Sequence, residues 1–138
     1  MAYWQFKFNE DRWYDWYENS VGDIEDWSSP KTRGGKPNDI SMSDIVFLYR
    51  TDMKNDRGIH FVSKVIHVDF TDEHPIELEI IKDLKENIFK PENFGFEILM
   101  NKINSLNRNG TYYKFDDEDN PQKLYDLIMN NEIDGVVT

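Results

Sequence analysis

The segment Ile45–Arg50, with the sequence IVFLYR, constrains the fold more than any other part of the chain. Its apolar and aromatic residues follow one another without a polar face. This pattern is typical of a central strand that is covered on both sides. The segment therefore predicts a sheet in which Ile45–Arg50 is an inner strand and its charged end opens onto a turn.

Other segments predict further strands. Tyr3–Phe8 alternates, with Trp4, Phe6 and Phe8 on one face, which is the period of a half-buried strand. The remaining predicted strands are residues 59–70, with a bulge near Ser63, residues 76–80, where apolar residues alternate with glutamates, and residues 111–115.

Helical signals lie between these strands. Asn9 is a good N-cap, and Trp13, Trp16 and Tyr17 recur at helical spacing, so we expect a short helix that ends between residues 19 and 22. Residues 22–43 show no sustained period and predict a long surface loop with at most short turns. We also expect a helical turn in residues 84–93, a short helix in 96–106 and a closing helix in 119–130. In the closing helix, Pro121 suits the first turn, and Leu124, Leu127 and Ile128 face inward.

These elements predict an α+β fold, a curved β-sheet or open barrel with flanking helices, in a single domain of residues 1–138. The chain lacks cysteine, which excludes disulfides and thiolate chemistry and favours a cytoplasmic location. It also lacks an apolar run long enough to cross a bilayer, so we expect no membrane partner.

The charge balance opposes strong non-specific DNA binding. The chain has 27 acidic residues against 16 Lys and Arg, a net charge of −11, so polyanions are repelled overall. Local positive charge is nevertheless present, because Lys31, Arg33 and Lys36 fall in a segment without acids. These three side chains are candidate phosphate contacts, and the alternative is a solvated loop.

Signals for catalysis or metal binding are weak. His60, His67 and His74 recur every seven residues, which on an extended chain sends neighbours to opposite faces, so we expect surface or half-buried strand residues and no metal cluster. The acidic run at residues 116–119 fits no calcium loop. Neither a phosphate-binding glycine loop nor a nucleophile motif is present, so we predict no enzyme activity, no metal and no cofactor.

The order and spacing of several motifs resemble EVE domains of the PUA-like group. The motifs are Tyr3-Trp4, Asn9-Glu10-Asp11 with Trp13, Ser43–Tyr49, and Gly58 with the strand that follows to Asp69. In addition, Asp26-Trp27-Ser28-Ser29 is similar to the Trp-containing segment that forms one wall of a methylated-base cage in the related YTH and ASCH domains. The chain departs from the pattern where Ser43 replaces a glycine and where residues 30–38 lack the common loop motif.

The resemblance implies a domain that accepts one flipped, modified base, a methylated cytosine or adenine, in DNA or RNA, and that contributes recognition without chemistry. Such domains occur alone or fused to restriction-type nucleases, so a nuclease or NTPase is a candidate partner. Carried over to this chain, the resemblance assigns three parts of a pocket. Trp27 and Ser28 line it, Lys7, Phe8 and Asn9 form its floor, and Tyr49, Arg50 and Thr51 close its far side.

Each candidate also has a simpler interpretation. Trp27 lies outside any apolar period, which favours a stacking role, but a ring that anchors its loop to the core is the alternative. Asn9 is explained by helix capping alone. For Trp4, Trp13, Trp16 and Tyr17, core packing is the better account. Three functions stay open: a reader of a modified base, a receptor for a free nucleotide-like ligand, and a protein-interaction module.

Overall fold

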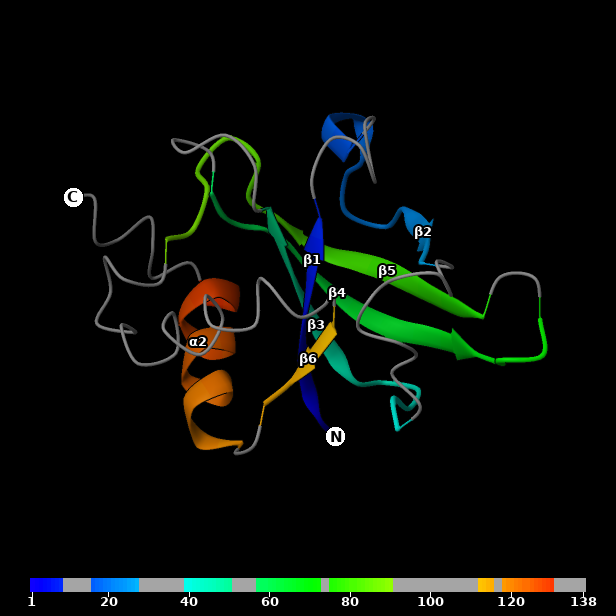
Figure 1. Cartoon of the computed structure of the whole chain (residues 1–138). Helices are drawn as coiled ribbons and strands as arrows, with labels where there is room; N and C mark the ends of the chain where they lie inside the picture. The colour runs from blue at the N-terminus through cyan, green and yellow to red at the C-terminus, as the bar shows by residue number, and fades with distance from the viewer. Residues whose placement is uncertain are drawn as a thin grey trace.

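The computed structural model describes residues 1–8, 16–27, 39–50, 57–72, 75–90, 112–115 and 118–130. Within these ranges the chain forms strands, one 3-10 helix and one α-helix (Figure 1). In chain order they are β1 (Tyr3–Phe8), η1 (Trp16–Glu18), β2 (Ile24–Asp26), β3 (Ile45–Arg50), β4 (Gly58–Val68), β5 (Ile76–Asp83), β6 (Tyr112–Lys114) and α2 (Asp119–Met129). The α+β prediction is confirmed.

The strands form one mixed sheet in the order β2-β5-β4-β3-β1-β6. β3 is an inner strand, as its apolar run predicts, and all six of its residues are buried. It pairs in parallel with β1 and antiparallel with β4. The two edge strands, β2 and β6, are not paired with each other in the described part of the chain, so the sheet does not close into a barrel.

Side chains of the two sheet faces form two separate clusters. We call the one that α2 covers the helix-side cluster and the other the Trp27-side cluster (Figure 1). The helix-side cluster contains Tyr3, Ile45, Phe47, Tyr49, Ile59, Val62, Leu84, Phe89, Phe115, Leu124 and Ile128. The Trp27-side cluster contains Trp4, Phe6, Phe8, Trp27, Ile40, Val46, Leu48, Phe61, Val65, Ile76, Leu78 and Ile80. Successive residues of β1 and β3 alternate between the clusters, as the pleat of a strand requires.

The closing helix is confirmed as α2. Leu124 and Ile128, four residues apart, are fully buried in the helix-side cluster, and Leu127 packs against it from a partly buried position. The Tyr3 hydroxyl donates a hydrogen bond to Oε1 of Gln122, which joins the first strand to this helix. Burial and the nearby Asp126 carboxylate raise the pKa of Tyr3.

Two expectations for the first third of the chain are wrong. The predicted loop contains β2, which is too short to show a period of its own and forms by pairing with β5, from Ile24 opposite Glu79 to Asp26 opposite Glu77. Tyr17, expected in the core, is 59% exposed, because it lies in a single 3-10 turn rather than on the inner face of an α-helix. Trp4 is buried as expected.

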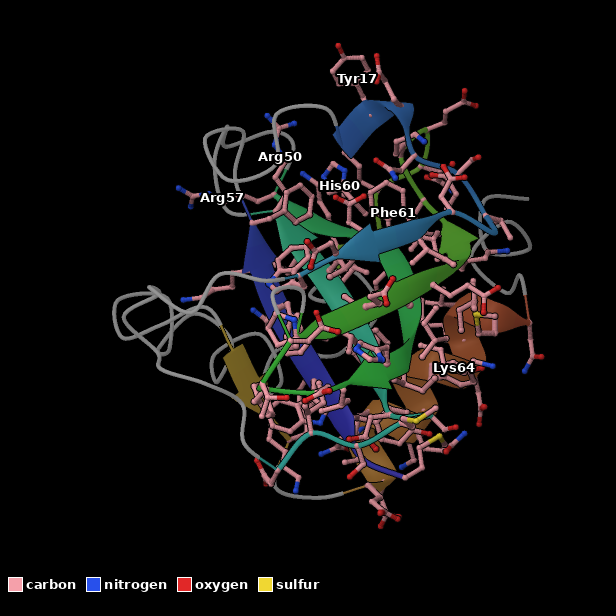
Figure 2. The ribbon with its side chains drawn as sticks, turned by 90° about the vertical axis from the view of Figure 1, so that its right-hand side faces the viewer. Tyr17, Arg50, Arg57, His60, Phe61 and Lys64 are labelled. Carbon is pink, nitrogen blue, oxygen red and sulfur yellow. The ribbon has the colours of Figure 1, made fainter. Side chains whose placement is uncertain are left out.

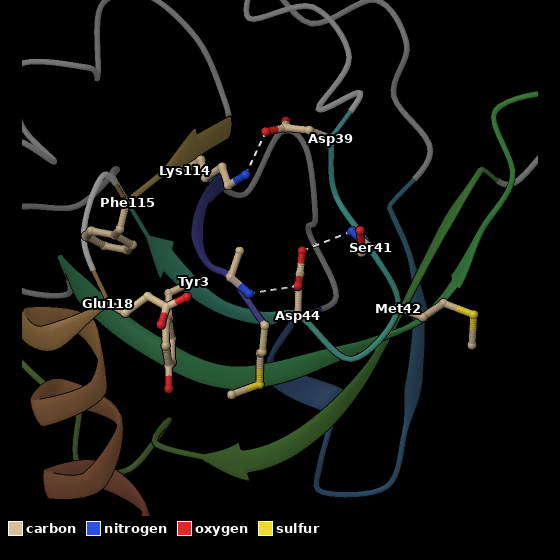
Figure 3. Close-up of a pocket in the computed structure, with 10 residues that line it drawn as sticks. Tyr3, Asp39, Ser41, Met42, Asp44, Lys114, Phe115 and Glu118 are labelled. Carbon is tan, nitrogen blue, oxygen red and sulfur yellow. Dashed lines mark hydrogen bonds and ion pairs between the residues drawn. The ribbon is translucent and has the colours of Figure 1, made fainter.

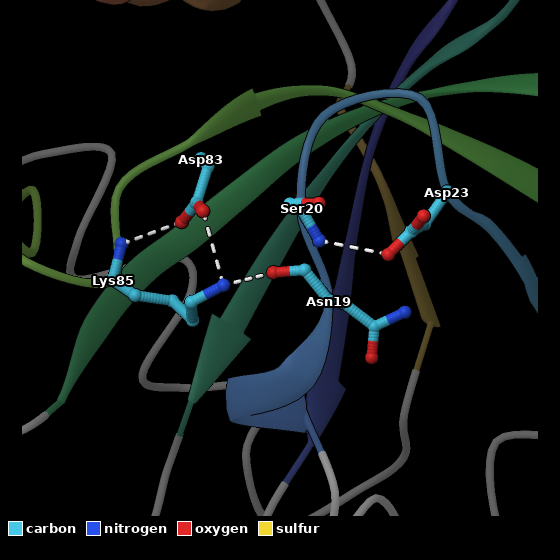
Figure 4. Close-up of polar contacts among 5 residues, drawn as sticks. All are labelled: Asn19, Ser20, Asp23, Asp83 and Lys85. Atoms are coloured by element: carbon cyan, nitrogen blue, oxygen red, sulfur yellow. Dashed lines mark hydrogen bonds and ion pairs between the residues drawn. The ribbon is translucent and has the colours of Figure 1, made fainter.

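The turn after β5 and the residues after η1 are joined by Lys85 (Figure 4). Its Nζ donates to the carbonyl oxygen of Asn19 and to Oδ2 of Asp83, the latter at 3.0 Å. The same Nζ lies 5.2 Å from the ring centre of Phe61. Residues 84–90 hold a turn, closed by Asn87 N–H to the Leu84 carbonyl, and no helix. The predicted helix at 96–106 and residues 9–15 of the first predicted helix lie outside the described residues.

The bulge expected near Ser63 is confirmed, since the β4–β5 register shifts between Val62 and Ser63. The Ser63 hydroxyl donates to the Val46 carbonyl at 3.0 Å, which satisfies this buried polar group. A second irregularity occurs opposite β3, where Leu48 pairs with Phe61 but Tyr49 pairs with Ile59. The residue between them, His60, is therefore the extra residue of a bulge.

Candidate functional site

The parallel pairing of β1 and β3 brings four of the predicted binding residues together. Lys7 lies opposite Tyr49, and Phe8 lies opposite Arg50, at the carboxyl ends of the two strands. The carboxyl ends of parallel strands meet at one edge of a sheet, and in open α/β sheets, which are mostly parallel, this edge is where ligands bind. The candidate site is this strand end.

The alternation of side chains divides the four residues between the two faces. Tyr3 and Tyr49 both belong to the helix-side cluster. Lys7 lies four residues after Tyr3 in the same strand, so it faces the same side of the sheet as these two residues. Phe8 belongs to the Trp27-side cluster, and Arg50 shares that face because it is two residues from Leu48. Each face of the strand end thus carries one cation beside one aromatic ring.

Lys7 is a buried residue, 8% exposed as a whole, with its ammonium partly withdrawn from solvent. Burial lowers its pKa from 10.5 to about 8, because a low-dielectric environment disfavours the charged form. At neutral pH the group is still mainly protonated. A cation with little hydration attracts an incoming anion more strongly than a solvated one does.

Arg50 is the second buried cation, at 3% exposure. Its guanidinium does not lose a proton in proteins, so its positive charge is permanent. Figure 2 shows Arg50 at the same end of the sheet as Arg57, His60 and Phe61, with Tyr17 of η1 above them and Lys64 near the opposite end. Arg57 is exposed at this end.

The backbone opposite Arg50 is Gly58, and its identity follows from packing. Gly58 has φ of +148°, and a Cβ there would lie 2.7 Å from the carbonyl oxygen of Phe89. Ile59 and Phe89 exchange backbone hydrogen bonds of 2.9 and 3.2 Å, so the chain approaches too closely for a side chain. Glycine is therefore required where β4 begins beside the site.

His60 is a site residue that the sequence pattern placed wrongly. It is 0% exposed rather than at the surface or half-buried, and its ring lies 5.7 Å from that of Phe8 in an edge-to-face arrangement. Its burial follows from the bulge, which takes it out of the regular alternation. His67 fits its expectation, because it is partly exposed and contacts Asp72 at 3.3 Å, and His74 lies outside the described residues.

Trp27 lies in the core of the Trp27-side cluster. It is 3% exposed, and its ring centre is 5.6 Å from that of Phe6. Its backbone N–H donates to the Ile76 carbonyl at 2.8 Å, directly after β2. Pairing of β2 with β5 thus carries the ring over the sheet although no local apolar period predicts it. This placement favours the anchoring interpretation, and a contact between Trp27 and a base stays a prediction.

Six of the sequence candidates lie outside the described residues: Asn9, Ser28, Lys31, Arg33, Lys36 and Thr51. Each directly follows, or lies within ten residues of, a described candidate in the chain. Their roles as pocket or phosphate contacts stay predictions. Across the described ranges, His, Asp and Glu side chains form no group of three that could hold a metal ion.

A hollow of about 380 Å³ lies at the opposite, amino end of β1 (Figure 3). Asp44 at its wall accepts hydrogen bonds from Ala2 N–H at 2.9 Å, Trp4 Nε1 at 3.1 Å and Ser41 N–H at 2.9 Å. Lys114 donates to Asp39 at 2.7 Å, a hydrogen bond that lowers the pKa of Asp39 and raises that of Lys114. These bonds join the loop before β3 to β1 and β6, so we assign them a structural role.

The only α-helix in the described residues is α2, with 11 residues, and no described helix is long and apolar enough to cross a membrane. Comparisons with protein-family models, with curated proteins and with solved structures gave no match to this chain.

Proposed function

We propose that this chain is a binding domain of the EVE type in the PUA-like group, which recognises a modified base, such as a methylated cytosine or adenine, in DNA or RNA and catalyses no reaction. The motif resemblance supports the family. One structural observation supports the site: two buried cations, Lys7 and Arg50, each lie beside an aromatic ring at one end of the sheet.

The chemistry of this strand end suits a nucleotide. A base stacked on an aromatic side chain gains about 1–3 kcal/mol, and flipping the base from a duplex costs a few kcal/mol. Cations beside the rings offset that cost by contacting a phosphate. Tyr49 or Phe8 would supply the ring, and Lys7 or Arg50 the charge.

A second candidate function is a receptor for a free nucleotide-like ligand at the same strand end. The net charge of −11 favours it, because a mononucleotide brings one phosphate to the local cations and no long polyanion to the acidic body. Two phosphate contacts with single-stranded nucleic acid predict that the logarithm of the association constant falls with the logarithm of salt concentration with a slope of about −1.4. A much flatter dependence would favour the free ligand.

Fluorescence anisotropy tests the proposal. The probes are single- and double-stranded DNA and RNA oligonucleotides, plain or carrying 5-methylcytosine, 5-hydroxymethylcytosine or N6-methyladenine. We expect one modified strand to bind at least tenfold more tightly than its plain counterpart. Absence of binding to every strand and to the free nucleotides would contradict both candidates and leave the protein-interaction module.

The choice of variant matters, because Trp27→Ala would remove a core ring and destabilise the fold by about 3–5 kcal/mol. Lys7→Met is the more specific test, since it keeps the length of the side chain and removes a charge whose burial is unfavourable. We expect it to reduce affinity for the preferred strand at least tenfold. Lys123→Met, at an exposed position of α2, makes the same change of charge and should bind like the wild type.

A further inference from the structure

Gln5, in the middle of β1, has a buried side-chain amide that forms no hydrogen bond within the described part of the chain. Its side chain is 1% exposed, and neither Nε2 nor Oε1 has a hydrogen-bond partner among the residues that the structure describes. Nearly all buried polar side chains in native proteins are hydrogen-bonded, so an amide with both ends unsatisfied requires an explanation. An apolar residue at this position would avoid the cost of burying the amide.

The side chains that the structure describes around Gln5 do not satisfy its amide. β1 is flanked by β3 and β6, and the residue opposite Gln5 in β3 is Phe47, a ring of the helix-side cluster. Tyr3 shares the face, but its hydroxyl donates to Gln122 in α2, and its ring stacks on Phe47 at 6.3 Å between ring centres. The described neighbours of the amide on this face, Tyr3 and Phe47, are therefore aromatic rings that offer it no free hydrogen-bonding group.

Lys7 is the next residue of β1 on this face, about 7 Å farther along the strand. It is 8% exposed and lies opposite Tyr49. One donor-and-acceptor group and one cation are thus placed in line on an otherwise apolar strip, with the cation nearer the carboxyl end of the strand. Such a pair suits a flat ligand that has a hydrogen-bonding edge and an anionic group.

We propose that Gln5 reads the edge of the bound base and that Lys7 holds its phosphate, so that the helix side of β1 is the recognition face. Nε2 of Gln5 donates to an acceptor of the base edge and Oε1 accepts from the neighbouring N–H. A nucleobase edge presents a donor beside an acceptor, and amide side chains bind such edges in bidentate fashion. This inference rests on the proposed function and assigns its specificity to a residue that the EVE resemblance does not single out.

Two variants separate the roles of the pair. Gln5→Leu removes the amide at similar volume, and we expect at least tenfold weaker binding of N6-methyladenosine or 5-methylcytidine 5′-monophosphate, whichever the wild type prefers. Lys7→Met should weaken the monophosphate at least tenfold but leave the matching nucleoside within twofold. The urea midpoint of Gln5→Leu should equal or exceed that of the wild type, because no hydrogen bond is lost.

The wild type provides a test that does not depend on a variant folding. The ¹⁵N–¹H signals of the Gln5 side-chain amide should shift when the preferred monophosphate is added. These signals are assigned by their loss in Gln5→Leu or by through-bond connectivity. If the ligand binds and these signals stay in place, the inference is overturned while the proposed function stands. If the wild type binds none of the nucleosides, monophosphates or modified strands, the proposed function fails and this inference fails with it.

Discussion

Replacing Lys7 with methionine should stabilise the protein at neutral pH, contrary to the usual effect of a core substitution. Burial lowers the pKa of Lys7 from 10.5 to about 8. At 1.36 kcal/mol for each pKa unit, holding the charged form in the folded chain costs less than about 3 kcal/mol, because solvent screens part of the cost for an ammonium that is only partly buried. Methionine has a similar length and no charge, so Lys7→Met should recover most of that free energy at pH 7.

The pH dependence has a defined sign. Below pH 8 Lys7 is protonated in both states, and the full cost is present. Between pH 8 and 10.5 the unfolded chain binds more protons than the folded one, so wild-type stability gains from Lys7 as pH rises. Above pH 10.5 the cost is gone. The stability advantage of Lys7→Met should therefore be greatest at pH 7 and below, should decrease through pH 8 and should shrink toward zero by pH 10.5.

Urea unfolding followed by tryptophan fluorescence measures both quantities at pH 7, 8, 9 and 10. Comparison of variant with wild type at each pH cancels the titration of the tyrosines and other lysines. Lys123→Met, at an exposed position, should change the free energy of unfolding by less than about 0.5 kcal/mol throughout. A Lys7→Met protein that is less stable than the wild type at pH 7, or an advantage that is constant with pH, would refute the reasoning.

Three further outcomes follow from the structure. The affinity of the wild type for an anionic probe should fall as pH rises from 7 through 9, because Lys7, with a folded pKa of about 8, loses its charge over this range. The affinity of Lys7→Met should not change in this way, and anisotropy in matched buffers measures both. Gly58→Ala should destabilise the fold by about 2–3 kcal/mol in urea, since its Cβ would meet the Phe89 carbonyl at 2.7 Å; a loss below 0.5 kcal/mol, on the order of a surface substitution, would contradict this. Asp44→Ala should cost about 3 kcal/mol by the same assay, because three N–H donors lose their acceptor, and an unchanged midpoint would show that these bonds contribute nothing.

The parts of the fold that were predictable are those with a regular period. The apolar run Ile45–Arg50 is an inner strand, Tyr3–Phe8 is its neighbour, and the apolar face at 119–130 is a helix on the sheet. For β3 and α2 the local pattern and the final burial agree, because the period of the residues matches the period of the backbone. For Tyr3–Phe8 the strand is confirmed, but the expected half-burial is wrong, because all six residues are buried. The juxtaposition of Lys7 with Tyr49 was predictable only as part of a family resemblance, since strand pairing is not local.

The parts that were not predictable depend on long-range pairing. Three residues of β2 carry no period, so neither the strand nor the burial of Trp27 beyond it follows from local sequence. His60 is buried because a bulge displaces it, and a bulge depends on the partner strand. The alternation of β1 predicts that Gln5 is an ordinary solvent-facing polar residue. Its burial follows only from the structure, in which both faces of β1 are covered.

The most direct test of the central claim is a titration of ¹⁵N-labelled wild-type protein with the modified oligonucleotide that binds best, followed residue by residue. A ligand at the carboxyl ends of β1 and β3 predicts that the largest shifts of the described backbone amides occur at Lys7, Phe8, Tyr49 and Arg50, with little change around Asp44 at the opposite end of β1. Shifts concentrated around Asp44 and Lys114, or none at the strand ends under saturating ligand, would contradict the account.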